Sequence, residues 1–259
     1  MALTRDRDGA VLTLTIDRPD ARNALNQEVL DGLLGGLREA RDDDRIRVVV
    51  LTGAGDRVFC AGADLAGGLG DAEAGAVAQH DSRGALIDLF DAVAELDKPL
   101  VGRINGHALA GGFGVALACD LLVATEEATF GTPEVKVGLW PFVISAVIVE
   151  HLGPKRALDL MMTGRRLPAA EALDWGLVNR VAPGDGLDDA VDDLVGQLLR
   201  ASPVALTLGR RSYHRSRGMS PRDAMAYLHG MLDLALQTED VAEGITAFFE
   251  KRDPDWPGR

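Results

Sequence analysis

Three glycines at positions 111, 112 and 114 mark the segment with the clearest chemical potential. They lie in Ile104-Asn-Gly-His-Ala-Leu-Ala-Gly-Gly-Phe-Gly-Val-Ala-Leu-Ala-Cys-Asp120. The pattern predicts a strand ending at Ile104, a glycine-bearing turn and a buried helix. The first turn of a helix has N–H groups without partners and partial positive charge, so it can hold an oxygen that becomes negative in a reaction. Alternatively, the glycines only let the helix pack tightly on a sheet.

Two further segments form turns after short apolar stretches. The run Phe59-Cys-Ala-Gly-Ala-Asp-Leu65 is a small-residue turn after a short apolar step. Glu134 follows Pro133 in a strand-and-turn region over 129–139. A Pro-Glu pair taken alone is most often a surface turn.

The composition indicates a globular protein of the cytoplasm. The 259 residues are 47% apolar, but charges or glycines interrupt every apolar run before the roughly 18 residues that a membrane span needs. The first residues lack the apolar stretch of a signal peptide. Cys60 and Cys119 stand among small apolar residues, so we expect buried thiols and no disulfide framework. A net charge of −13 argues against a nucleic-acid partner.

Apolar periodicity predicts an α/β body followed by a helical C-terminal part. We expect strands over 11–16, 46–51, 100–104 and 121–124, and helices over about 80–96, 143–152, 154–162 and 168–175. Asn26 is placed to cap a helix whose apolar face carries Val29, Leu30, Leu33, Leu34 and Leu37. From about residue 186 the chain is helical, with breaks at 202–203 and 220–221. The predicted division is a core over 1–200 that carries the active site and a helical region over 201–259.

Five short motifs follow one another along nearly the whole chain. They are Asp17-Arg-Pro19 with Arg22-Asn-Ala-Leu-Asn26, Phe59-Cys-Ala-Gly-Ala-Asp-Leu65, Ile104-Asn-Gly-His-Ala-Leu-Ala-Gly-Gly112, Phe130-Gly-Thr-Pro-Glu134 and Ala247-Phe-Phe-Glu-Lys-Arg252. Together they resemble the enoyl-CoA hydratase/isomerase family, also called the crotonase family. The resemblance implies a spiral of ββα turns, a helical C-terminal region that builds a trimer, and an acyl-CoA thioester substrate. It implies no metal and no cofactor, because CoA is part of the substrate.

The resemblance also implies roles for three residues. Chemistry next to a thioester puts negative charge on the thioester oxygen, so two fixed donors aimed at that oxygen lower the barrier. By position, the family's two donors are the backbone N–H groups of Ala63 and Gly111. Glu134 matches a catalytic glutamate of the family and would move the proton.

One departure from the family pattern bears on the reaction. A hydratase of this family usually has a second glutamate, but this chain has Gly114 at that position. One carboxylate suffices for an isomerase, and it suffices for some hydratases. The segment from Glu134 to Ser145 is similar to that of relatives that hydrate branched acyl-CoAs. We place hydration of a 2-enoyl-CoA first on the resemblance, and Δ3,Δ2-enoyl-CoA isomerisation second, which the residue chemistry alone favours.

Other positions match the substrate-binding residues of the family. We expect the substrate to contact Arg22, Ala24, Ala61, Asp64, Leu65, Gly114, Trp140, Phe142 and Lys251. Arg22 and Lys251 would meet CoA phosphates, or are solvated surface charges. Trp140 and Phe142 would shape the acyl pocket, or pack in the core. Asp64 also serves to anchor its own turn.

Weaker candidates and other functions stay open. His107 and His80 either border the site or are ordinary packed or surface residues, and Asp120 looks structural. A non-catalytic acyl-CoA-binding subunit is one alternative, prompted by Gly114. An RNA-binding member of the family is another, which this acidic chain disfavours. For a trimer or a dimer of trimers, we expect interface residues among Met225, Leu228, Met231, Leu232, Leu234 and Leu236.

Overall fold

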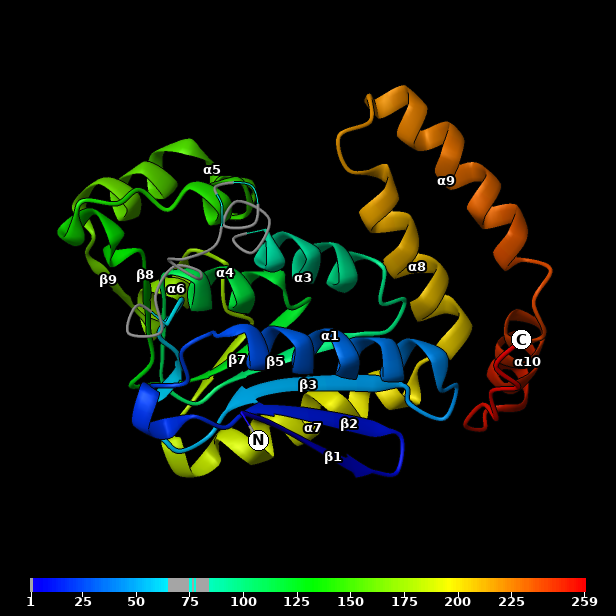
Figure 1. Ribbon diagram of the computed structural model, residues 1–259. Coiled ribbons are helices and arrows are strands. Elements are labelled where there is room, and N and C mark those ends of the chain that lie inside the picture. The colour runs from blue at the N-terminus through cyan, green and yellow to red at the C-terminus, as the bar shows by residue number, and fades with distance from the viewer. Residues whose placement is uncertain (1, 65–74, 76, 78–83) are drawn as a thin grey trace.

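Two β-sheets organise the part of the chain that the computed structural model describes, which is residues 2–64, 75, 77 and 84–259 (Figure 1). The larger sheet has the order β1-β2-β3-β5-β7-β10. Its strands are β1 (Leu3–Asp8), β2 (Val11–Ile16), β3 (Val48–Gly53), β5 (Leu100–Ile104), β7 (Leu121–Thr125) and β10 (Arg180–Ala182). The smaller sheet has the order β4-β6-β8-β9, with β4 (Val58–Cys60), β6 (His107–Leu109), β8 (Thr129–Gly131) and β9 (Arg166–Pro168).

Helices surround both sheets. They are α1 (Gln27–Asp42), α3 (Ala85–Ala94), α4 (Gly111–Ala118), α5 (Phe142–Thr163), α6 (Ala169–Asp174), α7 (Leu187–Arg200), α8 (Pro203–Ser216), α9 (Pro221–Ala235) and α10 (Glu239–Glu250). Among the described residues, three short 3-10 helices, each between a strand and an α-helix, are η1 (Pro19–Ala21), η2 (Pro133–Val137) and η3 (Gly184–Gly186).

The larger sheet is covered on both faces. Val49 and Leu51 of β3 join the main core with α1 and α3, while Val48 and Val50 pack with the apolar face of α7. Figure 1 shows α1 and α3 on one side of this sheet and α7 on the other. A strand buried on both faces needs a continuous apolar run, which explains the β-branched sequence of β3.

Several expected elements are present with small differences in their bounds. Asn26 caps α1, and its side chain accepts a hydrogen bond from the N–H of Val29 at 3.0 Å. The two helices expected over 143–152 and 154–162 form α5, which is interrupted by a non-helical Gly153 before Pro154. Strand β3 begins and ends two residues later than predicted. The described part of the helix expected at about 80–96 is α3.

The C-terminal helices extend to one side of the core (Figure 1). Ser202 and Ser220 cap α8 and α9, so the breaks expected at 202–203 and 220–221 are confirmed. Helix α9 has no buried residue in the single chain. The division of the chain at residue 200 stays a prediction, although α7 ends there.

Candidate active site

Three parallel strands end at one edge of the smaller sheet and deliver the three predicted catalytic residues. Strand β4 pairs in parallel with β6, and β6 pairs in parallel with β8. Ala63 follows the end of β4 by three residues, Gly111 follows β6 by two, and Glu134 follows β8 by three. Because the carboxyl ends of parallel strands share an edge, the fold brings these residues together.

The Ala63 turn is fixed by a neighbouring extended segment. The N–H of Leu25 donates to the carbonyl oxygen of Gly62 at 2.7 Å, and the N–H of Asp64 donates to the carbonyl oxygen of Leu25 at 2.9 Å. This isolated parallel bridge leaves the N–H of Ala63 pointing away from Leu25. Among the described residues, that N–H has no backbone acceptor. It is therefore available to a ligand oxygen.

The Ala63 and Gly111 turns touch each other. A Cβ atom on Gly62 would lie 2.9 Å from the Gly111 nitrogen and 2.7 Å from Ala110 Cβ, and Gly62 has a φ of +91°. Only glycine fits at this contact. Gly111 is the first residue of α4, so its N–H has no acceptor within the helix. Two free backbone donors on adjacent turns are the arrangement that an oxyanion hole requires.

Backbone strain sits beside this pair of donors. Ala110 has φ 51° and ψ −131°, which is unusual for a residue with a side chain. Its N–H donates to the carbonyl oxygen of Gly131 at 2.9 Å, which ties the turn to the end of β8. The strain energy of such a backbone conformation is on the order of 1–3 kcal/mol, and the surrounding structure must offset it. Conformations of this kind often occur at functional sites.

Glu134 carries the titratable group of the site. It lies in η2, and its Oε2 atom is buried without a hydrogen-bond partner among the described residues. Burial raises the pKa of this carboxyl above its usual range, against a smaller lowering by a backbone hydrogen bond. The hydroxyl of Thr132 is likewise buried without a partner in that part of the chain. Unsatisfied buried groups are rare, and here they are consistent with a ligand or a water binding next to η2.

Gly114 has no room for a side chain. An added Cβ atom would meet Ile144 of α5, whose own Cβ would lie 3.1 Å away, and Phe90 of α3, whose Cζ would lie 3.2 Å away. The position at which the resemblance expects a second glutamate is thus occupied by a branched apolar side chain from another helix. A carboxylate there would also be buried without a partner.

The structure gathers four of the nine predicted substrate-binding residues, Arg22, Ala24, Ala61 and Asp64, near Ala63. The N–H of Ala61 donates to the carbonyl oxygen of Arg22 at 3.2 Å. Arg18 donates to the carbonyl oxygen of Ala24 at 2.7 Å and to Asp64 Oδ2 at 2.8 Å. Asp64 therefore anchors its turn, as expected, and Arg22 is exposed beside it. Leu65 and His80 lie outside the described residues.

The remaining candidates are placed differently. Trp140 is half-buried against the main core, whereas Phe142 is 75% exposed at the start of α5. Lys251 follows α10, which Figure 1 shows at the opposite side of the molecule from β8. The structure does not bring Lys251 to the Ala63 edge within one chain.

Two other titratable residues have structural partners. His107 Nδ1 lies 3.0 Å from the hydroxyl of Thr129, and burial together with the charges of Arg166 and Arg57 lowers the pKa of this histidine. Asp120 accepts from the N–H of Leu100 at 2.8 Å, in line with the structural role expected for it.

The described ranges contain no cluster of three or more histidine, cysteine, aspartate or glutamate side chains that would hold a metal ion. No helix within those ranges is long and apolar enough to cross a membrane.

Three residues that position the site had no role in the sequence-based prediction. Asn23 is buried at φ 54°, and its Nδ2 donates to the carbonyl oxygen of Val58 at 2.7 Å. Asparagine tolerates left-handed backbone, which was a usable signal. Ala110 and Ile144 gave no such signal, because strain and contacts between helices are not visible in local sequence.

Comparison with known proteins decides the family. The model of the enoyl-CoA hydratase/isomerase family matches residues 6–259. The chain belongs to this family. It is 38% identical to the carnitinyl-CoA dehydratase of Salmonella enteritidis PT4, over 98% of this chain and 97% of that protein. Family membership makes the protein an enzyme and is consistent with an acyl-CoA thioester substrate.

Solved structures confirm the crotonase fold for this family member. The enoyl-CoA hydratase of Mycobacterium smegmatis has a TM-score of 0.94 at 32% identity, with 99% of each chain covered. The enoyl-CoA hydratase of Bacillus anthracis has a TM-score of 0.93 at 29% identity, with 100% of each chain covered. The expected α/β fold with a helical C-terminal part is therefore confirmed.

Proposed function

We propose that this enzyme adds water to, or removes water from, the C2–C3 bond of an acyl-CoA thioester. The observation that carries the proposal is the carboxyl group of Glu134, whose Oε2 atom is buried without a partner among the described residues, at the same sheet edge as the free N–H groups of Ala63 and Gly111. The name of the Salmonella relative, carnitinyl-CoA dehydratase, supports a reaction that moves water.

In the hydration direction, the proposed step uses Glu134 twice. Its carboxylate accepts a proton from water while the water oxygen bonds to C3 of a 2-enoyl-CoA. The electrons of the C2–C3 double bond move toward the thioester oxygen, which the N–H groups of Ala63 and Gly111 stabilise. Glu134 then returns the proton to C2 as the enolate collapses. Atoms and charges balance with one carboxylate, and dehydration follows the reverse path.

The raised pKa of Glu134 suits this double role. A general acid and base works best when its pKa lies near the operating pH, and burial moves the carboxyl in that direction. The buried apolar contact between Ile144 and Gly114 leaves no room at Gly114 for a second acid that would handle the C2 proton. Returning the same proton is the remaining route within the described site.

Isomerisation is the second candidate, and the occupied position beside Gly114 favours it. In a Δ3,Δ2-isomerase, Glu134 takes a proton from C2 of a 3-enoyl-CoA and delivers it to C4, while the same two donors hold the enolate. The absence of a second carboxylate at Gly114 suits this single shuttle.

For substrate binding, we propose that exposed Arg22 meets a CoA phosphate at the Ala63 edge. Lys251 is on the far side of the chain and would reach bound CoA only from a second subunit. A trimer or a dimer of trimers, with no further cofactor, is part of this proposal.

A panel of CoA thioesters tests the proposal. With 2-enoyl-CoAs, hydration removes the conjugated chromophore, and with 3-hydroxyacyl-CoAs dehydration creates it. With 3-enoyl-CoAs, isomerisation creates it. The proposal predicts turnover with the first two classes. Turnover with 3-enoyl-CoAs alone would establish the isomerase, and no turnover with any class would favour the binding subunit.

A further inference from the structure

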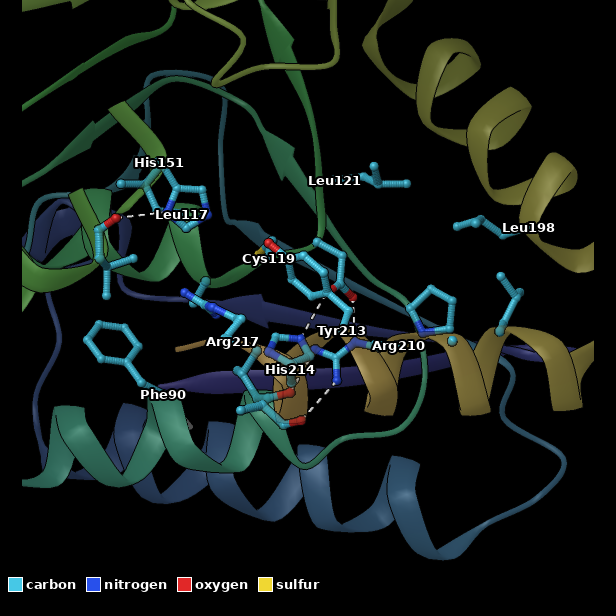
Figure 2. Close-up of a pocket in the computed structure, with 18 of the residues that line it drawn as sticks. Phe90, Leu117, Cys119, Leu121, His151, Leu198, Arg210, Tyr213, His214 and Arg217 are labelled. Carbon is cyan, nitrogen blue, oxygen red and sulfur yellow. Dashed lines mark hydrogen bonds and ion pairs between the residues drawn. The ribbon is translucent and has the colours of Figure 1, made fainter. Parts of the chain in front are cut away.

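A cavity of about 490 Å³ lies at the end of α4 opposite to Gly111. Its walls come from α3, α4, α5 and α8, with Phe90, Leu117, His151 and His214 among them (Figure 2). Cavities of 300–1,000 Å³ are the usual size for small-molecule sites. None of Ala63, Gly111 or Glu134 lines this one.

The cavity and the oxyanion edge lie at opposite ends of α4. Helix α4 has eight residues and is therefore about 12 Å long, with the Gly111 donor at its start and the cavity at its end. Ile144 and Phe90 pack against Gly114, between these two ends. The cavity begins one helical turn beyond this contact, at Leu117 of α4 and Val147 of α5.

One wall of the cavity is apolar. Phe90 and Val93 of α3, Leu117 of α4 and Val147 of α5 supply it. Helix α8 supplies the opposite wall through residues spaced three or four apart, which share one helix face. They are Leu206, Gly209, Arg210, Tyr213, His214 and Arg217, and Figure 2 shows the labelled ones reaching toward Phe90 and Cys119.

His214 is the unsatisfied group in this wall. Both of its ring nitrogens are buried, and neither has a hydrogen-bond partner within the described part of the chain. Its Nε2 lies 3.7 Å from Asp120 Oδ1, which is beyond hydrogen-bond length but within ion-pair distance when the ring is protonated. Leaving such groups unpaired destabilises the folded protein, so a ligand that pairs with His214 is favoured.

The lining of the cavity contains more basic side chains than acidic ones, although both of its arginines are paired. Arg210 and Arg217 line it together with His214 and His151, against the single carboxylate of Asp120. Arg210 is committed to Asp120 at 2.8 Å, and Arg217 pairs with Glu150. Burial also lowers the pKa of Arg217, so a further negative charge nearby would stabilise its cationic form.

We propose that this cavity binds an aliphatic carboxylate. Its hydrocarbon chain lies against Phe90, Leu117 and Val147, and its carboxylate accepts from His214 next to Arg217. The site does not depend on the reaction at Glu134. The carboxylate belongs either to a free fatty acid or to the far end of an acyl chain whose thioester is at the oxyanion edge.

Gly209 offers a direct test, because a Cβ atom added there meets no atom within 4 Å. Isothermal titration of the full chain with octanoate, at saturating CoA, measures binding while the CoA site is occupied. Gly209→Phe fills the cavity and should weaken octanoate binding by at least about tenfold. Gly209→Ala is the matched control and should bind within about twofold of the native protein. Circular dichroism checks that both variants fold.

His214→Phe tests the polar contact. It keeps a ring of similar shape but removes both nitrogens, so octanoate affinity should fall by about tenfold or more, as expected for a lost hydrogen bond to a charged group. Octanol, which has no carboxylate, should bind within about twofold of native. Equal losses for the two ligands would contradict a carboxylate contact at His214.

Kinetics with acyl-CoAs distinguishes the two sources of the carboxylate. If the ligand is the end of the substrate, Gly209→Phe raises KM for an ω-carboxyacyl-CoA but not for the unsubstituted chain. If the ligand is a free acid, neither KM changes. The proposal would be overturned if octanoate does not bind, if CoA displaces bound octanoate, or if Gly209→Phe binds octanoate as tightly as the native protein does. Each of these results would hold even if hydration is established.

Discussion

Ile144 packs directly against Gly114, so that a Cβ atom on the glycine would lie 3.1 Å from the Cβ of the isoleucine. Helices α5 and α4 are held together at this point, and Phe90 of α3 closes the contact from the third side. The structure therefore has no space for a second carboxylate at Gly114, and Glu134 is the one carboxylate in the proposed site.

The first prediction concerns this contact. Gly114→Ala should lower the free energy of unfolding by about 1–3 kcal/mol, because the added methyl group overpacks a closed contact. Urea unfolding measures the change. Gly209→Ala, on an open helix face, is the control and should raise stability by about 0.5–1 kcal/mol. Equal stability of Gly114→Ala and the native protein would mean that Ile144 moves freely and that a side chain fits.

The second prediction concerns the oxyanion donors. Ala63→Pro removes one N–H, and turnover should fall by about 10²–10³ if the protein stays folded. Gly111→Ala keeps the other N–H, and its Cβ finds ordinary contacts of 3.6 Å, so it should remain active. Gly111→Pro would disturb the backbone as well as remove the N–H. The preceding residue, Ala110, has ψ −131°, which is far from the values that a residue before proline adopts. A folded Ala63→Pro protein with native turnover would show that Ala63 is not a donor.

Much of the fold can be predicted from the sequence, because local residue patterns determine many of its strands and helices. The alternation of β2 places Leu12, Leu14 and Ile16 in the core, and Asn26 begins α1, both as expected. Strand β6 was missed, since three residues, His107–Leu109, are too few to show a period. The segment was interpreted as part of the turn before α4.

The candidate site was only partly readable. The sequence motifs identify Ala63, Gly111 and Glu134 as candidates. The fold brings all three residues to one edge of the smaller sheet. The contact of Ile144 with Gly114 joins helices thirty residues apart in sequence, and no local pattern encodes it. The exposure of Phe142 likewise depends on tertiary packing.

The third prediction follows from the pKa of Glu134. Burial raises this pKa in the folded state, so the folded protein holds the proton more tightly than the unfolded chain. The carboxyl's contribution to stability is therefore full at low pH and is lost as pH rises through the folded pKa. Glu134→Gln should raise the melting temperature at pH 7–8 and change it little at pH 4. A melting-temperature difference that is the same at both pH values would contradict the raised pKa.

The fourth prediction concerns oligomerisation. Helix α9 exposes Met225, Leu228, Leu232 and Leu236, which are three or four residues apart and form one apolar stripe. Sedimentation of the native protein at micromolar concentration should give a trimer or a hexamer. The Leu232→Glu variant should contain a larger fraction of monomer, because the charge disrupts the apolar stripe. Leu173→Glu, at an exposed leucine of α6, is the control and should leave the assembly intact. A native protein that sediments as a stable monomer would refute this prediction.

The most direct test of the proposed chemistry is the turnover of Glu134→Gln on the preferred CoA thioester. Glutamine keeps the shape of the side chain but cannot accept the proton, so kcat should fall by about 10²–10⁴ with acyl-CoA binding little changed. Glu126→Gln, at an exposed glutamate, is the matched control and should keep native turnover. If Glu134→Gln retains native kcat on every thioester that the native enzyme turns over, Glu134 does not carry the proton and the account of this site is wrong.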